Sequence, residues 1–301
     1  MSGEEKHCGF VGIIGAPNAG KSTLINRLVG AKVSIVSPKV QTTRTRVMGI
    51  VNKSQTQIVF VDTPGIFTPK KRLDRAMVSA AWAGADDAEV ILLIIDVARG
   101  KINSESRAII EKLKKQKRKT LLALNKIDLV AKEKLLALAA EMQATDVFTD
   151  IYMISAATGD GVDALLKDIA ARMPAGPWMF SEDQISDMPL RLLAAEITRE
   201  KIFLQLKEEL PYASTVETET WEEFDNGSVK IGQVIYVMRD TQKAIILGKG
   251  GAQIKKIGAS SRRELEEILE RRVHLSLFVK VRENWIDDPE RYGAWGLDFG
   301  A

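Results

Sequence analysis

The chain has 301 residues, of which 45% are hydrophobic, and it carries a formal net charge of +3 at pH 7. This length exceeds what one compact core usually holds, so we expect two domains, and so small a net charge does not by itself indicate nucleic-acid binding. The lone Cys8 excludes an intramolecular disulfide framework and fits a reducing cytoplasm, and the most apolar run, residues 90–95, is far shorter than the ~20 residues that cross a bilayer.

Apolar runs alternate with helical patterns from Cys8 to Arg172. This alternation predicts an α/β domain with a parallel sheet covered by helices on both faces. The expected strands are 9–14, 57–61, 90–95, 120–124 and 151–154, with a shorter edge strand near 46–51. Ligands of such sheets bind beyond the carboxyl ends of the strands, so polar motifs at those ends should converge on one site.

A glycine-rich motif follows the first expected strand. Its residues, which spell G-x-x-x-x-G-K-S, are Gly15, Ala16, Pro17, Asn18, Ala19, Gly20, Lys21 and Ser22. The next segment starts at Ser22 and Thr23 and runs to Val29, and its apolar residues have helical spacing. The motif therefore lies between a strand and a helix, where phosphate-binding loops are found. Backbone N–H groups of such a loop wrap a pyrophosphate, while Lys21 would bridge the β- and γ-phosphates and the Ser22 hydroxyl would ligate Mg²⁺.

A polar stretch lies between the first helix and the second strand. It contains Gln41, Thr42, Thr43, Arg44 and Thr45. A mobile loop at this place could bring a threonine to Mg²⁺ and the γ-phosphate, and we favour Thr43 over Thr42 for that role. The alternative is an ordinary threonine-rich loop.

A D-x-x-G motif follows the strand expected at 57–61. It consists of Asp62, Thr63, Pro64 and Gly65. An acidic residue at that strand end would hold Mg²⁺ through water, and the Gly65 N–H would reach a γ-phosphate.

An N-K-x-D motif follows the strand expected at 120–124. It consists of Asn125, Lys126 and Asp128, and the residues Ser155, Ala156 and Ala157 follow the next strand. A carboxylate accepts from both N1–H and the exocyclic amine of guanine, whereas adenine offers no such donor pair, so Asp128 should select GTP over ATP. We expect Asn125 and Lys126 to tie the base loop to the phosphate loop, and a backbone N–H of residues 155–157 to bind the guanine O6.

The second half of the chain has a different pattern. Residues 174–188 are proline-rich and aperiodic, which predicts a linker between a G domain at 1–173 and a second domain at 189–285. The second domain should have a helix at 190–209, strands near 212–221 and 229–238, two helical segments and a strand near 273–282. This α-β-β-α-α-β order is a small α+β domain, and residues 286–301 are expected to form a loosely ordered C-terminal tail.

The second domain contains a G-x-x-G motif between its two helical segments. In KH domains such a loop clamps the backbone of about four nucleotides, and the α-β-β-α-α-β order matches the second KH topology. The residues expected to contact RNA are Ile246, Gly248, Lys249, Gly250, Gly251, Ile254, Lys255 and Lys256. From Thr241 to Arg263 there are six basic residues and no acidic one, which favours contacts with phosphates over an ordinary solvated helix.

These motifs, in this order, resemble those of the translation-factor-related GTPases. Within that class the chain is similar to the Era family of bacterial ribosome-assembly GTPases, of the TrmE-Era-EngA-like group. Pro17-Asn18 in the phosphate loop and Ile66 directly after Gly65 support the class. Ras-like proteins orient the attacking water with a glutamine at that last position, which isoleucine cannot do, so unaided hydrolysis should be slow.

The resemblance covers nearly the whole chain and implies further properties. Potassium-activated members of the class imply that Asn18 ligates K⁺, which would supply the charge that an arginine finger supplies elsewhere. The family implies GTP and GDP as ligands, binding of the 3′ region of 16S rRNA through the KH domain, and a role in maturing the small (30S) ribosomal subunit. It also implies peripheral association with the cytoplasmic face of the inner membrane. A monomer is the default expectation.

The sequence therefore predicts a GTPase whose nucleotide state is coupled to RNA binding. Its expected catalytic residues are Lys21, Thr43, Asp62, Gly65 and Asn18, with Ser22, Thr43 and Asp62 as the Mg²⁺ site. Two alternatives belong to other classes. One is an RNA-binding module in which nucleotide is only structural, and the other is a GTP switch directed at a protein or membrane partner.

Overall fold

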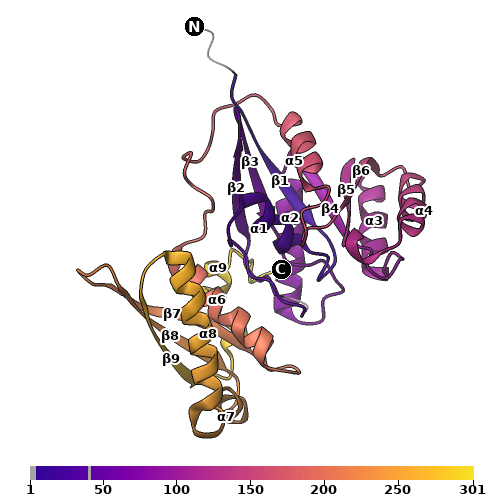
Figure 1. Ribbon diagram of the computed structural model, residues 1–301. Coiled ribbons are helices and arrows are strands. Elements are labelled where there is room, and N and C mark those ends of the chain that lie inside the picture. The colour runs from indigo at the N-terminus through magenta and orange to yellow at the C-terminus, as the bar shows by residue number, and fades with distance from the viewer. Residues whose placement is uncertain (1–4, 40–41) are drawn as a thin grey trace. The chain divides into compact units, whose positions relative to one another are not determined.

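The computed structural model describes residues 5–39 and 42–301 (Figure 1). The chain divides into two compact units. The first unit comprises Met1–Ser34, Thr43–Asp187 and Tyr292–Ala301, and the second comprises Ile35–Thr42 and Met188–Arg291. Within the described ranges, no helix is both long and apolar enough to cross a membrane.

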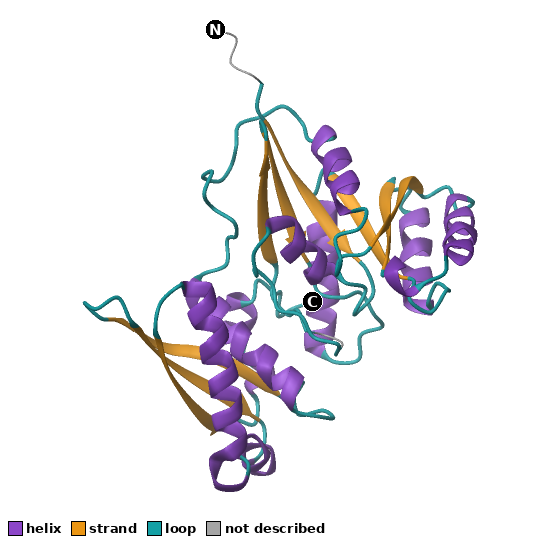
Figure 2. Ribbon diagram, in the orientation of Figure 1, coloured by secondary structure: helices purple, strands orange, loops and turns teal. Residues whose placement is uncertain are grey.

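The first unit is built on a six-stranded sheet of order β2-β3-β1-β4-β5-β6. Figure 2 shows the strands of this sheet in orange and the helices in purple. Its strands are β1 (His7–Ile14), β2 (Val47–Lys53), β3 (Thr56–Asp62), β4 (Val90–Asp96), β5 (Thr120–Asn125) and β6 (Phe148–Ile154). Every neighbouring pair is parallel except β2 and β3, which are antiparallel. The α/β fold expected from the alternating apolar runs is thus confirmed, with β2 as an antiparallel edge strand.

Five helices accompany this sheet in the described part of the first unit. They are α1 (Lys21–Val29), α2 (Arg72–Asp86), α3 (Ser104–Lys115), α4 (Lys132–Gln143) and α5 (Val162–Ala171). The central strands are buried on both faces, as their continuous apolar runs require, because helices cover each side. Helix α3 begins where the Asn103 side chain accepts a hydrogen bond from the Ser106 N–H at 2.8 Å, which satisfies a donor that the first turn leaves free.

The proline-rich segment expected as a linker follows the exposed edge of β2. Ile50 N–H donates to the Ile185 carbonyl at 2.9 Å, and Met48 N–H donates to Asp187 Oδ1 at 2.8 Å. These contacts satisfy backbone groups that an edge strand would otherwise expose. Most of the segment therefore belongs to the first unit.

The second unit has the expected α-β-β-α-α-β order. Its elements are α6 (Leu190–Gln205), β7 (Ser214–Glu223), β8 (Val229–Val237), α7 (Asp240–Leu247), α8 (Ala252–Leu269) and β9 (Val273–Val281). The sheet order is β7-β8-β9, with β7 antiparallel and β9 parallel to β8. Helices α6 and α8 pack on one face of this sheet, which confirms the second KH topology (Figure 1).

The expectation of a loosely ordered C-terminal tail is wrong. The end of the chain contains a 3₁₀ turn at Trp285–Asp287 and helix α9 (Pro289–Ala294). Trp285 and Tyr292 are fully buried, and the Tyr292 ring packs edge-on against Phe299 with centroids 5.0 Å apart. The large area that aromatic side chains bury outweighs the polar, aperiodic character of the segment.

Candidate nucleotide site and nucleic-acid interface

Two glycines of the phosphate loop stand where a larger residue would collide. A Cβ at Gly15 would lie 2.5 Å from the Ile94 carbonyl oxygen, and a Cβ at Gly20 would lie 2.2 Å from Asn125 Nδ2. Gly20 also has φ 102°, which disfavours any L side chain. The loop between β1 and α1 therefore lies directly against the neighbouring β4 and β5 ends, as a phosphate cradle at the carboxyl edge of a sheet requires.

The Lys21 side chain folds back onto the loop. Its ammonium donates to the carbonyls of Gly15 and Ala16 at 3.2 and 3.3 Å, and the residue is only 6% exposed. Burial lowers the pKa of Lys21 to about 8, although the charge of Asp62 opposes the shift. The Lys21 ammonium is buried and donates to carbonyl oxygens, so it is placed to bind the phosphate oxygens of a nucleotide.

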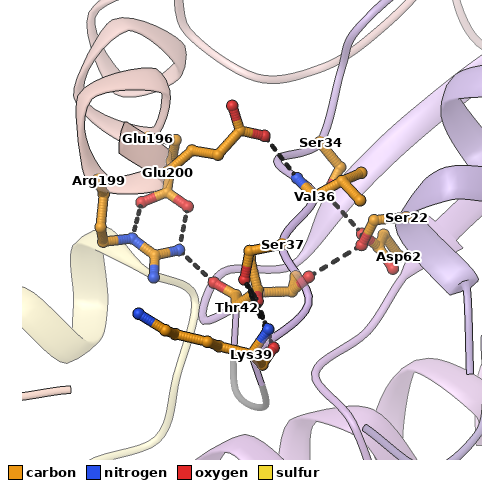
Figure 3. A network of polar contacts seen from close by, with 11 residues as sticks. Ser22, Ser34, Val36, Ser37, Lys39, Thr42, Asp62, Glu196, Arg199 and Glu200 are labelled. Carbon is orange, nitrogen blue, oxygen red and sulfur yellow. Dashed lines mark hydrogen bonds and ion pairs between the residues drawn. The ribbon is translucent and has the colours of Figure 1, made fainter. Parts of the chain in front are cut away.

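Three side-chain oxygens, of Ser22, Thr43 and Asp62, meet at the start of α1. Figure 3 labels Ser22 and Asp62 at this point. Ser22 Oγ donates to Asp62 Oδ2 at 2.8 Å and lies 3.0 Å from Thr43 Oγ1. Adjacent ligands of an octahedral Mg²⁺ at about 2.1 Å lie about 3.0 Å apart, so this spacing already suits the ion. Asp62 Oδ1 is buried and accepts no hydrogen bond of normal geometry from the described residues. The three side chains expected at the metal therefore fit Mg²⁺.

The Asp62 carboxylate is fully buried, and this burial raises its pKa. A hydrogen bond from Ser34 Oγ at 2.7 Å, the charge of Lys21 and the hydrogen bond from Ser22 oppose the rise. Ser34 escaped the sequence analysis because no motif marks it. A cation at this point would stabilise the ionised carboxylate strongly.

The D-x-x-G segment packs onto the phosphate loop. A Cβ at Gly65 would lie 2.9 Å from Pro17 backbone atoms, and the Ile66 N–H donates to the Gly15 carbonyl at 3.0 Å. Thr63 Oγ1 donates to the Ile13 carbonyl at 2.7 Å. The Ile66 side chain is buried in the apolar core, so it offers no group that could orient a water.

Asn125 joins the phosphate loop to the base loop, as expected. Its Nδ2 donates to the Ala19 carbonyl at 2.8 Å, and its Oδ1 accepts from the Ala156 N–H at 2.9 Å. The ammonium of Lys126, for which the same role is predicted, pairs with Asp96 Oδ2 at 2.6 Å. Asp96 was missed, although it is a polar residue at the carboxyl end of a strand, which is the signal that identified the others.

Asp128 lies in an exposed 3₁₀ turn, Ile127–Leu129, which follows β5. Ser155 is buried at the end of β6, whereas Ala157 is exposed. Arg27 Nε donates to the Ala156 carbonyl at 3.3 Å and so ties α1 to this loop. A cavity of about 450 Å³ opens here, lined by Thr23, Asn26, Arg27, Gly30, Ala31, Lys32, Ala156 and Ala157.

The two candidate threonines have different surroundings. Thr43 Oγ1 lies 3.0 Å from Ser22 Oγ. Thr42 Oγ1 instead forms hydrogen bonds with the Ser37 hydroxyl at 2.6 Å and with the Lys39 carbonyl at 2.8 Å. Gln41 of the same motif lies outside the described residues. The exposed Asn18 adopts φ 61° within the phosphate loop. The geometry thus places Thr43, and not Thr42, beside the metal-site oxygens.

The G-x-x-G loop begins α8 of the second unit. A Cβ at Gly248, which has φ 71°, would lie 2.7 Å from the Gln253 Cβ. Gly250 and Gly251 also have positive φ, at 59° and 76°, and a Cβ at either would meet no atom within 4 Å. The loop therefore turns tightly and leaves its outer side open, with Lys249 exposed on it.

A groove of about 290 Å³ lies between α8 and β9. It is lined by Ile254, Lys255, Gly258, Ala259, Arg262, Leu275 and Leu277. The spacing of Ile254, Gly258 and Arg262 at i, i+4 and i+8 could have indicated this face from the sequence. The expectation that Ile246 contacts RNA is wrong, because its side chain is fully buried in the core of the second unit.

A phosphate loop, the N-K-x-D turn after β5 and a G-x-x-G groove define the class, a GTPase with a KH domain. Family models agree with this assignment. A model described as "50S ribosome-binding GTPase" matches residues 10–126, and a model described as "KH domain" matches residues 209–286.

Proteins of known name are similar over nearly the whole chain. GTPase Era of Afipia carboxidovorans is 59% identical over 302 residues, which cover 99% of this chain and 98% of that protein. GTPase Era of Sinorhizobium medicae is 61% identical over 291 residues, which cover 97% of this chain and 94% of that protein. The chain belongs to the Era family of GTPases.

Solved Era structures have the same fold. A crystal structure of Era in complex with MgGDPNP and nucleotides 1506–1542 of 16S ribosomal RNA matches with a TM-score of 0.91 and 41% identity, covering 97% of this chain and 99% of that one. A variant of Aquifex aeolicus Era bound to GDP and AlF₄⁻ matches with a TM-score of 0.90 and 41% identity, covering 96% and 99%.

Proposed function

We propose that this GTPase binds the 3′ region of 16S rRNA through its KH domain and acts as a GTP-dependent switch in assembly of the small ribosomal subunit. The observation that carries the proposal is the similarity, over 97% of the chain, to the Era structure that holds MgGDPNP and nucleotides 1506–1542 of 16S rRNA. The groove beside the G-x-x-G loop supports it, because apolar residues and cations line the same surface.

At the nucleotide site, each residue has a separate task. Bound Mg²⁺, held by Ser22, Thr43 and Asp62, would neutralise charge on the β- and γ-phosphates. Lys21 would bind the same phosphates from the loop side, and the Gly65 N–H would bind the γ-phosphate. Hydrolysis is expected to be slow unaided, since Ile66 cannot orient the attacking water.

A potassium ion would complete the charge at the phosphates. We propose that the side chain of Asn18 ligates it, since this exposed residue has φ 61° in the phosphate loop. The monovalent cation would there substitute for an arginine finger. A rate of hydrolysis that depends on K⁺ over Na⁺ in the wild type, but not in Asn18→Ala, would support this role.

The proposal extends to the surroundings of the protein. The partner is the small (30S) ribosomal subunit, the protein acts as a monomer in the cytoplasm, and some of it associates peripherally with the cytoplasmic face of the inner membrane. The basic segment from Thr241 to Arg263 suits a partner rich in phosphate.

Binding of a labelled RNA from the 3′ end of 16S rRNA tests the proposal. We expect tighter binding with a non-hydrolysable GTP analogue than with GDP, and at least a tenfold loss in Gly250→Asp. Gly227→Asp is the matched control, because Gly227 also has positive φ and lies in an exposed turn away from the loop. Equal affinity of wild type and Gly250→Asp would contradict the proposal and favour a protein- or membrane-directed switch.

A further inference from the structure

The segment between Ser34 and Thr43 connects two parts of the nucleotide site, yet its described residues, 35–39 and 42, belong to the second unit. Immediately before this segment, Ser34 Oγ donates to Asp62 Oδ2 at 2.7 Å. Immediately after it, Thr43 Oγ1 lies 3.0 Å from Ser22 Oγ. Whatever fixes the segment therefore also constrains both hydroxyl groups.

The beginning of the segment is packed into the second unit. Ile35 is 2% exposed in an apolar cluster with residues of α6. The next N–H, of Val36, donates to Glu200 Oε1 of α6 at 2.8 Å (Figure 3). A hydrogen bond to a carboxylate is stronger than one between neutral groups, so this contact fixes the backbone firmly.

The Lys39 ammonium holds the middle of the segment. It donates to the carbonyls of Phe203 and Leu206, at the C-terminal end of α6. The last carbonyls of a helix have no partner within the helix and carry its negative dipole end, so a cation there is favoured.

Arg199 holds the end of the segment. Its Nη2 donates to the Thr42 carbonyl, one residue before Thr43. Arg199 is only 1% exposed, and its Nε donates to Glu196 Oε1 at 2.7 Å. The buried ion pair leaves the guanidinium little freedom, so the Thr42 carbonyl is held by a rigid donor.

Helix α6 also contacts α8, the helix that carries the G-x-x-G loop. Gln205 Nε2 donates to Ser260 Oγ at 2.7 Å, and Gln253 Nε2 donates to Gln205 Oε1 at 3.3 Å. Lys201 pairs with both Glu200 and Glu264 of α8. Helix α6 thus has direct partners in the segment before Thr43 and in the RNA-groove helix.

We propose that Lys39, Arg199 and Glu200 are positioning residues for Thr43. By fixing residues 35, 36, 39 and 42 on α6, they hold the Thr43 hydroxyl at metal-ligand spacing from Ser22, and α6 transmits the same constraint to α8. Ordering the segment in advance avoids the entropy cost of ordering it when GTP binds. The inference rests on the proposed function of Thr43 as an Mg²⁺ ligand.

Steady-state hydrolysis at varied GTP and Mg²⁺ tests the inference in the full chain. Glu200→Ala and Lys39→Met should each lower kcat about five- to thirtyfold and raise the Mg²⁺ concentration for half-maximal rate, with less than about twofold change in the KM for GTP. Glu200→Gln should restore most of the rate, because its amide oxygen still accepts from Val36 N–H. Arg199 is left intact, because its removal would bury an unpaired Glu196.

Two exposed residues near the end of α6 supply matched controls. Glu209→Ala and Lys207→Met remove the same charges where no described contact to residues 35–39 or 42 exists, and both should retain wild-type kinetics. Unchanged kcat and Mg²⁺ dependence in Glu200→Ala and Lys39→Met would overturn the inference. So would a loss that Glu200→Gln shares, or one that parallels a lowered unfolding temperature. Absence of turnover in the wild type would instead count against the nucleotide site itself.

Discussion

At the scale of single residues, Lys21 carries a direct test of the nucleotide site. In the protein free of nucleotide and metal, the pKa of Lys21 is about 8 in the folded chain, whereas the ordinary pKa of lysine is 10.5. Between these values the unfolded chain binds one more proton than the folded chain, so stability should rise with pH.

Unfolding by urea at pH 8 to 10, in the presence of a chelator, measures this effect. The free energy of unfolding of the wild type should rise relative to Lys21→Met, with a slope approaching about 1.4 kcal/mol per pH unit. Parallel pH profiles of the two proteins would show that the Lys21 ammonium is not buried as the structure has it.

Asp128 carries the choice of base. Asparagine offers one donor and one acceptor, which suits the N1–H and O2 of xanthine instead of the two donors of guanine. We therefore expect Asp128→Asn to lose at least about a hundredfold in GTP affinity and to gain affinity for XTP. Competition binding with both nucleotides measures the change. An unaltered preference for GTP would mean that another residue reads the base.

At the scale of elements, the groove on α8 depends on Gly258. A Cβ there would lie 3.4 Å from Leu277 Cδ1, which is ordinary contact, so a larger side chain would fill the groove without displacing the sheet. Leucine also favours a helix over glycine by about 0.8 kcal/mol.

Gly258→Leu should therefore weaken RNA binding more than tenfold while the unfolding temperature stays level or rises. RNA binding followed by fluorescence anisotropy, beside thermal unfolding and GTP turnover, measures this. If RNA affinity stayed within twofold of the wild type, the bases would lie elsewhere on the KH domain.

The elements themselves were largely predictable from the sequence. Each expected strand of the first unit appears within three residues of its predicted ends, because its apolar run must be buried. The segment 174–188 was recognised as aperiodic, but its pairing with β2 could not be foreseen, since backbone contacts of an edge strand leave no pattern in side chains. Helix α9 was missed because the aromatic contacts that bury it, such as the Tyr292 ring against Phe299, leave no periodic pattern in the sequence.

The motif residues of the nucleotide site could also be predicted from the sequence. They converge, because each follows a strand whose end lies at one edge of the sheet. Ser34 and Arg199 were not found, because their roles come from tertiary contacts that leave no local spacing in a single sequence. Asp96 was also missed, although its place at the carboxyl end of β4 could have indicated it.

At the scale of the whole molecule, we expect RNA binding to depend on where the basic residues lie more than on the net charge of +3. Replacing Lys255 and Lys256 by glutamine should reduce the slope of log affinity against log salt by about 1.4, since each phosphate contact on a single strand contributes about 0.7. Binding titrations over roughly 50–300 mM KCl measure the slope.

The matched control lies on α3. Lys114 and Lys115 are exposed there, and replacing both by glutamine should leave the slope unchanged. Equal reductions in the two double variants would show that the whole positive surface, and not the G-x-x-G face, binds the RNA.

The central claim is that nucleotide chemistry and RNA binding are coupled in this chain. Steady-state GTP hydrolysis in K⁺ buffer, with and without an oligonucleotide matching the 3′ end of 16S rRNA, tests it most directly. We predict a clear acceleration by the RNA, absent in Gly250→Asp. An unchanged rate, with GTP and RNA both shown to be bound, would contradict the coupling and leave the RNA as a tether.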